Sequence, residues 1–304
     1  MKQFILRMLV LTLLAVGIAA CSTDGGDNEG EPNDTSDTGA DGDADADSDT
    51  DSPNLEICNG IDDDNNGIID DVDVGGDGIC DCLNIATVGE PGVWGDGNIF
   101  SDWLTERSST AVVNLGDAVL TDSLLAPLQV IVFLNVGEGE DGINRQYDSE
   151  EVDALSRWVA SGGGIMTTIG YASYREEVDN INRLLAPYDI YYDSAAVLQK
   201  QGDQTVPITE WVAHDTTDGV TAVGVDNGYE VMGTPAALAQ EQGIVMARAT
   251  GYEEGNVFVW GDEWICYDSE WENITDYQIE RFWLNIIKWL TPEDECQVAI
   301  PPVL

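Results

Sequence analysis

Residues 149–170 read SEEVDALSRWVASGGGIMTTIG, and they predict one unit of a layered fold. Apolar residues recur at helical spacing in the first half, so residues 149–160 are expected to form an amphipathic helix capped by Ser149. Three consecutive glycines end this helix, and the apolar run 165–170 follows as a strand. A helix that leads directly into a buried strand is typical of a parallel α/β sheet.

The same alternation continues on both sides of this stretch. Five further strands are expected, at residues 83–88, 111–115, 129–135, 190–192 and 256–260. Three further helices are expected, at residues 98–107, 179–186 and 277–290. We therefore expect residues 83–291 to form an α/β domain with an open, mostly parallel, doubly wound sheet, followed by a C-terminal tail over residues 292–304.

The first 20 residues have the order of charges and apolar residues that is typical of a signal peptide. Lys2 and Arg7 precede an apolar run that is too short to span a bilayer, and small residues lead into Cys21. This junction resembles a bacterial lipobox, which implies that Cys21 carries acyl chains that hold the exported protein on a lipid bilayer. Ser22, in place of Asp, implies the outer membrane or the cell surface. The alternative is an ordinary signal peptide followed by an unmodified cysteine.

The charge of the chain is extreme, since 58 acidic residues against 11 basic ones give a net charge of −47. Such a surface repels nucleic acid, which is therefore not an expected partner, and it attracts cations. Residues 21–55 are rich in Asp, Gly, Ser, Thr, Asn and Ala, so they have little apolar surface to bury. We expect this segment to be an extended, disordered tether.

Residues 62–73, DDDNNGIIDDVD, have the spacing of a calcium-binding loop. Alternate side chains on a tight loop converge on one centre, and a glycine allows the sharp turn. The expected Ca²⁺ ligands are Asp62, Asp64, Asn66, the carbonyl of Ile68, Asp70 and Asp73. A closing Asp instead of Glu, and Gly-rich flanks instead of helices, lower the expected affinity. The alternative is an acidic run that matches the pattern by chance.

The surrounding segment, residues 56–82, resembles the helix-less calcium loops of dockerins and thrombospondin type 3 repeats. Its CNGIDDD stretch, residues 58–64, also resembles the metal-binding motif of MopE-like bacterial surface proteins. Asn65 and Asn66 stand where that motif has Cys and Asp, so its local disulfide does not carry over. The resemblance implies a short calcium-stabilised module between the tether and the domain.

Five cysteines remain once Cys21 is lipidated, and the compartment outside the inner membrane allows disulfides. They are Cys58, Cys80, Cys82, Cys266 and Cys296. Cys58 can pair with Cys80 or Cys82, and Cys266 can pair with Cys296, while the odd number leaves at least one thiol free or paired between chains. The only histidine is His214, so a zinc site is not expected.

Three short stretches of the domain resemble a known superfamily. RWVASGGG (157–164), NRLLAPYDIYY (182–192) and HDTTDGV (214–220) are similar to class I glutamine amidotransferase-like proteins, the last to their ThuA-like branch. The resemblance implies a flavodoxin-like fold. It also implies a Cys nucleophile on the elbow after strand 165–170, where this chain has Tyr171, and a His-Pro-Glu stretch after strand 256–260.

The triad of this superfamily is incomplete here. Gly261 stands in place of the His, and only Glu263 matches the acid. A phenol is a poor nucleophile near neutral pH, so amidotransferase activity is not expected from Tyr171. Ser173 could replace the nucleophile only if His214 reached it in the folded chain.

Ligands of open parallel sheets bind at the carboxyl ends of the strands. The candidate ligand-binding residues in the loops there are Tyr171, Ser173, Asp262, Glu263, Trp264, Asp268, Glu270 and Trp271. Trp264 and Trp271 are expected at the rim of the site, and the core is expected to hold Trp260, Trp283 and Trp289. These loops favour a non-catalytic surface lipoprotein that binds a glycan or a protein. The alternative is a surface hydrolase that uses the carboxylates of the Asp262–Glu270 loop.

Overall fold

The computed structural model describes residues 55–91, 96–108, 112–137, 146–170, 175–272 and 275–302. The signal peptide expected over residues 1–20, Cys21 and the tether up to residue 54 lie outside these described residues. Within them, no helix combines the length and the hydrophobicity that are needed to cross a membrane.

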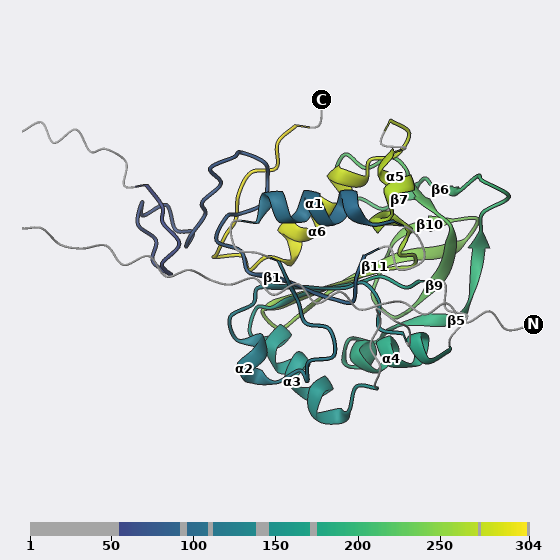
Figure 1. Cartoon of the computed structure of the whole chain (residues 1–304), viewed down its shortest axis with the longest axis horizontal. Helices are drawn as coiled ribbons and strands as arrows, with labels where there is room; N and C mark the ends of the chain where they lie inside the picture. The colour runs from purple at the N-terminus through teal and green to yellow at the C-terminus, as the bar shows by residue number, and fades with distance from the viewer. Residues whose placement is uncertain are drawn as a thin grey trace, which may run out of the picture. The chain divides into compact units, whose positions relative to one another are not determined.

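One eight-stranded sheet forms the centre of the domain, in the order β2-β1-β3-β4-β12-β11-β10-β7 (Figure 1). The parallel strands are β2 (Val113–Asn114), β1 (Ile85–Val88), β3 (Val130–Phe133), β4 (Gly164–Thr167) and β12 (Gly255–Trp260). The antiparallel strands are β11 (Ile244–Tyr252), β10 (Ala237–Glu241) and β7 (Glu210–Trp211). The parallel part has the flavodoxin-like strand order 2-1-3-4-5, which confirms the expected open, mostly parallel sheet.

The central strands are buried on both sides, as their apolar sequences predict. All four residues of β1, β3 and β4 are buried. In register, Val132 of β3 lies beside Met166 of β4, and Met166 lies beside Phe258 of β12. Such continuous apolar strands require helices on both faces of the sheet.

Helices cover both faces (Figure 1). The helices on one face are α1 (Asn98–Arg107), α5 (Asp268–Glu272) and α6 (Ile279–Leu290). The helices on the other are α2 (Asp122–Leu125), α3 (Ser149–Ala160) and α4 (Arg175–Leu185). Phe100 and Trp283 belong to the core on the first face, and Leu155 and Ile181 belong to the core on the second. The doubly wound arrangement is therefore confirmed.

The quoted stretch 149–170 folds as expected, except for the residue that caps its helix. Asp148, rather than Ser149, is the N-cap, because its Oδ1 accepts hydrogen bonds from the backbone N–H groups of Glu150 and Glu151 at 2.9 and 3.0 Å. The Glu151 carboxylate in turn accepts a hydrogen bond from the Asp148 N–H and completes a capping box. After the helix, Gly164 is required by packing, since a Cβ there would lie 2.2 Å from the carbonyl oxygen of Leu290.

Most of the remaining elements lie between α4 and β12, and the sequence predicted only one strand among them. β5 (Ile190–Gln199) begins where a strand was expected but is ten residues long, and it pairs with β9 (Asn227–Gly233). A second ribbon joins β6 (Val206–Ile208) to β8 (Val223–Val225). The 3₁₀ turns in the described part of the chain are η1 (Ala186–Tyr188), η2 (Asp215–Thr217) and, after β12, η3 (Trp264–Cys266).

Two disulfides tie the acidic segment into the domain. Cys58 pairs with Cys82, one of the two expected alternatives, and Cys80 pairs with Cys296. The expected pair Cys266–Cys296 is wrong, and Cys266 is a buried free thiol. The physical reason is α6, whose twelve residues extend for about 18 Å between the two cysteines. The tail beyond α6 instead meets the acidic segment, where the Cys296 N–H donates to the Ile69 carbonyl at 2.8 Å.

Candidate strand-end site and acidic segment

Glu263 lies against the start of the elbow that follows β4. A Cβ on Gly170 would come within 2.6 Å of the Glu263 carboxyl group, so a larger residue there would require that carboxyl group to move. The Glu263 side chain is buried, and its Oε1 accepts a hydrogen bond from the phenol of Tyr267. Tyr171 and Ser173, the expected elbow residues, lie outside the described residues. The Glu263 carboxyl group thus has a tyrosine hydroxyl as a partner inside the fold.

A second carboxylate approaches the same elbow, and the sequence did not reveal it. Glu177 lies in the first turn of α4, is 5% exposed, and accepts a hydrogen bond from the Gly170 N–H at 3.2 Å. Burial raises the pKa of Glu177 to about 7, although the Gly170 hydrogen bond acts in the opposite direction. In sequence, Glu177 is indistinguishable from any acid at a helix N-terminus, where such residues are common for electrostatic reasons.

Asp262 joins the end of β12 to the turn between β8 and β9. Its Oδ2 accepts hydrogen bonds from the N–H groups of Asp226 and Asn227, and its Oδ1 accepts one from Trp264 at 3.1 Å. The side chain is 2% exposed, and burial raises the pKa of Asp262 to about 7. This carboxyl group therefore connects backbone segments inside the fold.

Glu270 has a similar role on the neighbouring helix. It has no exposed surface, its Oε1 accepts a hydrogen bond from the Gly224 N–H at 2.9 Å, and burial raises the pKa of Glu270 to about 8. Nearby, the Lys200 ammonium lies 2.9 Å from Asp226 and 5.0 Å from the centre of the Trp264 ring. The Lys200 ammonium is thus shared between a carboxylate and a half-buried indole.

Two of the other candidate residues support helix α1. The carboxylate of Asp268 accepts hydrogen bonds from the Ile99 N–H at 2.8 Å and from the Asn98 amide, and so caps the start of α1. Trp271 is 5% exposed, and its ring lies 5.4 Å from that of Trp103. The expected rim position of Trp271 is therefore wrong, because this indole fills the core beneath α1.

The other tryptophans agree more closely with expectation. Trp264 is half-buried beside Lys200, while Trp260 and Trp283 are fully buried in the core. Trp289 is only partly buried and packs against the core from its edge.

His214 lies at the opposite end of the sheet from Glu263. Its Nδ1 is 2.9 Å from the hydroxyl of Thr216, and its ring packs on Trp289 at 5.1 Å. The carbonyl of Trp289 accepts a hydrogen bond from Asn256, near the start of β12, whereas Glu263 follows the end of that strand. Six strand residues separate the two ends by about 20 Å. The single histidine of the chain is therefore remote from Glu263.

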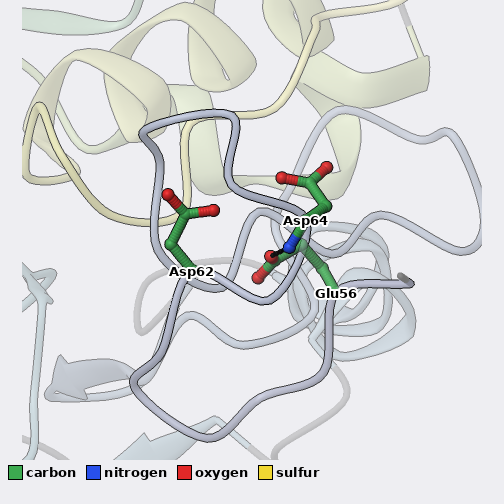
Figure 2. A group of neighbouring side chains, drawn as sticks. All are labelled: Glu56, Asp62 and Asp64. Carbon is green, nitrogen blue, oxygen red and sulfur yellow. Dashed lines mark hydrogen bonds between the residues drawn. The ribbon is translucent and has the colours of Figure 1, made fainter. Parts of the chain in front are cut away.

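In the acidic segment, three carboxylates converge (Figure 2). Oxygen atoms of Glu56, Asp62 and Asp64 lie within 4.8 Å of one another. Glu56 also accepts a hydrogen bond from the Asp64 N–H at 2.8 Å, and Asp62 accepts one from the Gly67 N–H at 2.9 Å. Glu56 precedes the twelve-residue pattern, so loop spacing did not predict it.

The later positions of the twelve-residue calcium-loop pattern do not join these three carboxylates. Asp70 accepts hydrogen bonds from the N–H groups of Asn59 and Gly60, and Asp73 accepts them from Asp77 and Gly78. The Asn66 amide donates to Asp64 and Asp71, and its oxygen accepts from the Ile68 N–H at 2.7 Å. The structure thus brings together the first two expected carboxylates with Glu56, and it places Asp70 and Asp73 in two other turns.

Comparison with known proteins supports the fold. No protein-family model matches the chain, and no curated protein matches it. Among solved structures, the cytoplasmic protein STM1381 from Salmonella typhimurium is similar at 14% identity and a TM-score of 0.52, over 69% of this chain and 100% of that one. The mmIFT52 N-terminal domain is similar at 12% identity and a TM-score of 0.51, over 68% of this chain and 96% of that one.

A ThuA-like protein from Bacteroides uniformis is also similar, at 11% identity and a TM-score of 0.45, over 73% of this chain and 95% of that one. The two matches with the higher scores show the same α/β fold, and at these identities they show nothing further about activity or ligands.

Proposed function

We propose that this chain is a non-catalytic lipoprotein of the outer membrane or cell surface whose α/β domain binds a ligand, a glycan or a protein. The observation that carries the proposal is the separation of Glu263 from His214. The acid of the superfamily's triad is bonded to Tyr267, and the only imidazole lies at the other end of β12. A strand-end elbow without an activated nucleophile can still hold a ligand.

The test is an assay of amide hydrolysis with the purified full chain. Amide hydrolysis on this fold needs a thiolate and an imidazole, and a phenol with a pKa of about 10 replaces neither near neutral pH. We expect no turnover of glutamine or of simple amides, and no change in Tyr171→Phe. Hydrolysis by the wild type that disappears in Tyr171→Phe would refute the proposal.

The alternative function, a hydrolase that uses the Asp262–Glu270 loop, has one observation in its favour. Asp262 and Glu270 have pKa values raised to about 7 and 8, in the range that suits general acid catalysis. Both carboxyl groups are nevertheless buried and hydrogen-bonded to backbone N–H groups, so a substrate would have to displace the β8–β9 turn to reach them. We therefore favour the binding function.

Export and lipid anchoring at Cys21 are part of the same proposal. The two disulfides support them, because structural disulfides persist in compartments outside the cytoplasm. We expect the wild-type protein to fractionate with membranes until detergent is added, and Cys21→Ser to be released without detergent. A soluble wild type with an unmodified amino terminus would contradict the anchor.

We further propose that Ca²⁺ stabilises the acidic segment. Calcium prefers hard oxygen donors, and the converging oxygens of Glu56, Asp62 and Asp64 supply such donors on one side of the loop. The ion would connect the residues before the loop to the loop itself. Extracellular loops of this kind bind calcium with dissociation constants of about 10⁻⁴ to 10⁻³ M, so the effect on stability is expected to be modest.

A further inference from the structure

A groove of about 610 Å³ lies on the helical face formed by α1 and α6. Its size is within the range of small-molecule sites, which span about 300 to 1,000 Å³. The side chains that matter below are Asp77, Arg107, Glu280, Arg281, Pro301 and Pro302. They come from four parts of the chain: the acidic segment, α1, α6 and the C-terminal tail.

One side of the groove is a fixed set of paired charges. Arg107 donates to Glu280 at 2.6 Å, and the Trp103 indole N–H donates to the same oxygen at 2.9 Å. The Arg107 guanidinium also lies 4.6 Å from the centre of the Trp103 ring. These contacts hold both charged groups in place while leaving 17% of the Arg107 side chain and 31% of the Glu280 side chain exposed.

Both guanidinium groups of the groove are already paired with carboxylates, in a chain that carries −47 as a whole. Glu280 binds Arg107 and Asp218 binds Arg281, at 2.6 and 2.9 Å, and Asp77 adds a further carboxylate to the lining. An anionic ligand would approach against the charge of the whole molecule. A cation would have to compete with guanidinium groups already in place.

A hydroxyl group suits this side of the groove better than either ion. Each hydroxyl can donate to a carboxylate and accept from a guanidinium at the same time. The rings of Pro301 and Pro302 also line the groove and give it a stiff, partly exposed apolar surface. A ligand with hydroxyl edges and an apolar C–H face would therefore satisfy both sides.

Two walls of the groove depend on one disulfide. Asp77 lies three residues before Cys80, and Pro301 lies five residues after Cys296, its disulfide partner. The segments touch beside the bond, since a Cβ on Gly78 would come 2.7 Å from Pro301 Cδ. The Cys80–Cys296 disulfide therefore joins the two segments that form these walls.

We propose that this groove is the binding site for a neutral, hydroxyl-rich ligand, a short glycan, and that the Cys80–Cys296 disulfide assembles it. This inference rests on the proposed ligand-binding function, and it assigns the glycan-binding site to the groove instead of the strand ends. The acidic segment then has a second role, because it supplies one wall of the site.

The test uses calorimetry on the purified full chain in detergent with cellotriose, maltotriose and mannotriose as neutral probes, and with glucuronate and spermidine as charged ones. We expect at least one neutral trisaccharide to bind. Arg107→Ala should weaken it about tenfold or more, as the loss of a charge-assisted hydrogen bond predicts. The matched control is Arg157→Ala, which removes an exposed ion pair with Asp122 elsewhere and should leave binding unchanged.

A more conservative variant tests the groove even if Arg107→Ala fails to fold. Glu280→Gln keeps an acceptor for Trp103 and Arg107, so it should remain folded yet bind the trisaccharide more weakly. The double variant Cys80→Ser, Cys296→Ser should lose binding while thermal unfolding still reports a folded domain. Equal effects of Arg107→Ala and Arg157→Ala, preference for a charged probe, or binding by none of the probes would overturn the proposal. If Trp264→Ala abolished trisaccharide binding and Arg107→Ala left it intact, the ligand would bind at the strand ends. That result would overturn the assignment of the site to the groove but not the proposed ligand-binding function.

Discussion

The acidic segment and the strand-end cluster contain the same side chains in opposite surroundings. In the segment, the Asp64 side chain is exposed, and those of Glu56 and Asp62 are half-buried. At the strand ends, Asp262 and Glu270 are almost completely buried, and their carboxyl groups accept hydrogen bonds from backbone N–H groups. Burial thus separates acids that can attract a cation from acids that connect the fold. Composition alone treats both sets as negative charge.

The two regions also differ in what holds them in place. The segment has few apolar side chains to bury and depends on two disulfides and on its contact with the C-terminal tail. The strand-end cluster is held by hydrogen bonds and by the core on both faces of the sheet. Each difference predicts a different response to mutation and to pH.

The largest expected effect is the loss of the Cys80–Cys296 disulfide. This bond spans 216 residues of sequence, against 24 for Cys58–Cys82. In the chain-entropy model, closing the longer loop stabilises the folded state by about 5 kcal/mol, and closing the shorter one by about 3 kcal/mol. Urea unfolding of Cys80→Ser, Cys296→Ser should therefore show a larger loss of unfolding free energy than Cys58→Ser, Cys82→Ser.

Cys266→Ser is the control for these variants, because it alters a buried thiol without opening a loop. Its effect should be the smallest of the three. If both disulfide variants lose the same free energy as Cys266→Ser, the segment is not stabilised through its covalent links to the domain.

The next effect concerns pH and the strand-end cluster. Burial raises the folded-state pKa of Glu270 from 4.5 to about 8, and that of Asp262 from 3.8 to about 7. Folding therefore favours the protonated forms. Their contribution to stability is fully present below the unfolded pKa values and is lost as the pH rises through the folded ones. The unfolding free energy should fall between about pH 4 and pH 8.

Glu270→Gln isolates one part of this decline. Gln keeps an acceptor for the Gly224 N–H and carries no charge at any pH. The variant should match the wild type near pH 5 and exceed its unfolding free energy near pH 9 by on the order of 4 kcal/mol. The control Glu254→Gln changes an exposed acid and should leave the pH profile unchanged. A Glu270→Gln profile parallel to that of the wild type would mean that Glu270 is ionised within the fold.

The parallel half of the sheet was predictable because its signals are local and strong. The helix expected at residues 98–107 has the same bounds as α1, and the run 256–260 differs from β12 by one residue. The β-rich part over residues 206–252 was missed for the opposite reason. Strands such as β9 and β11 mix buried and half-buried residues without a regular period, so their pairing partners define them.

The candidate site was predictable only where chain neighbours carried the signal. Glu263 was found because it follows a strand in a familiar position. Glu177 and Asp226 reach the same region from other elements, and their sequence surroundings resemble those of any surface acid. The misplacement of Trp271 has a related cause, because the core that buries it includes Trp103 on α1. Contacts between distant segments decided each of these cases.

The smallest expected effect is the calcium response of the acidic segment. At a calcium concentration about twenty times the dissociation constant, a single site adds about 2 kcal/mol to the unfolding free energy. For each variant, the free energy of unfolding in urea is measured with and without calcium. The difference between the two values removes the effect of the mutation on the apoprotein. The wild type should show this difference, and Asp62→Asn should reduce it.

Substitutions of Glu56 and of Asp73 distinguish a calcium site in the twelve-residue loop from one at the cluster of Glu56, Asp62 and Asp64. A twelve-residue loop of the expected spacing uses Asp73 as its closing ligand and has no place for Glu56. In the folded segment, the Glu56 carboxylate lies with those of Asp62 and Asp64, while Asp73 accepts hydrogen bonds from the turn at residues 77–78. Glu56→Gln should therefore remove most of the calcium response, and Asp73→Asn should lower the baseline stability but keep the response. The reverse result would restore the twelve-residue loop, and the Glu56 cluster would then be only a hydrogen-bonded turn.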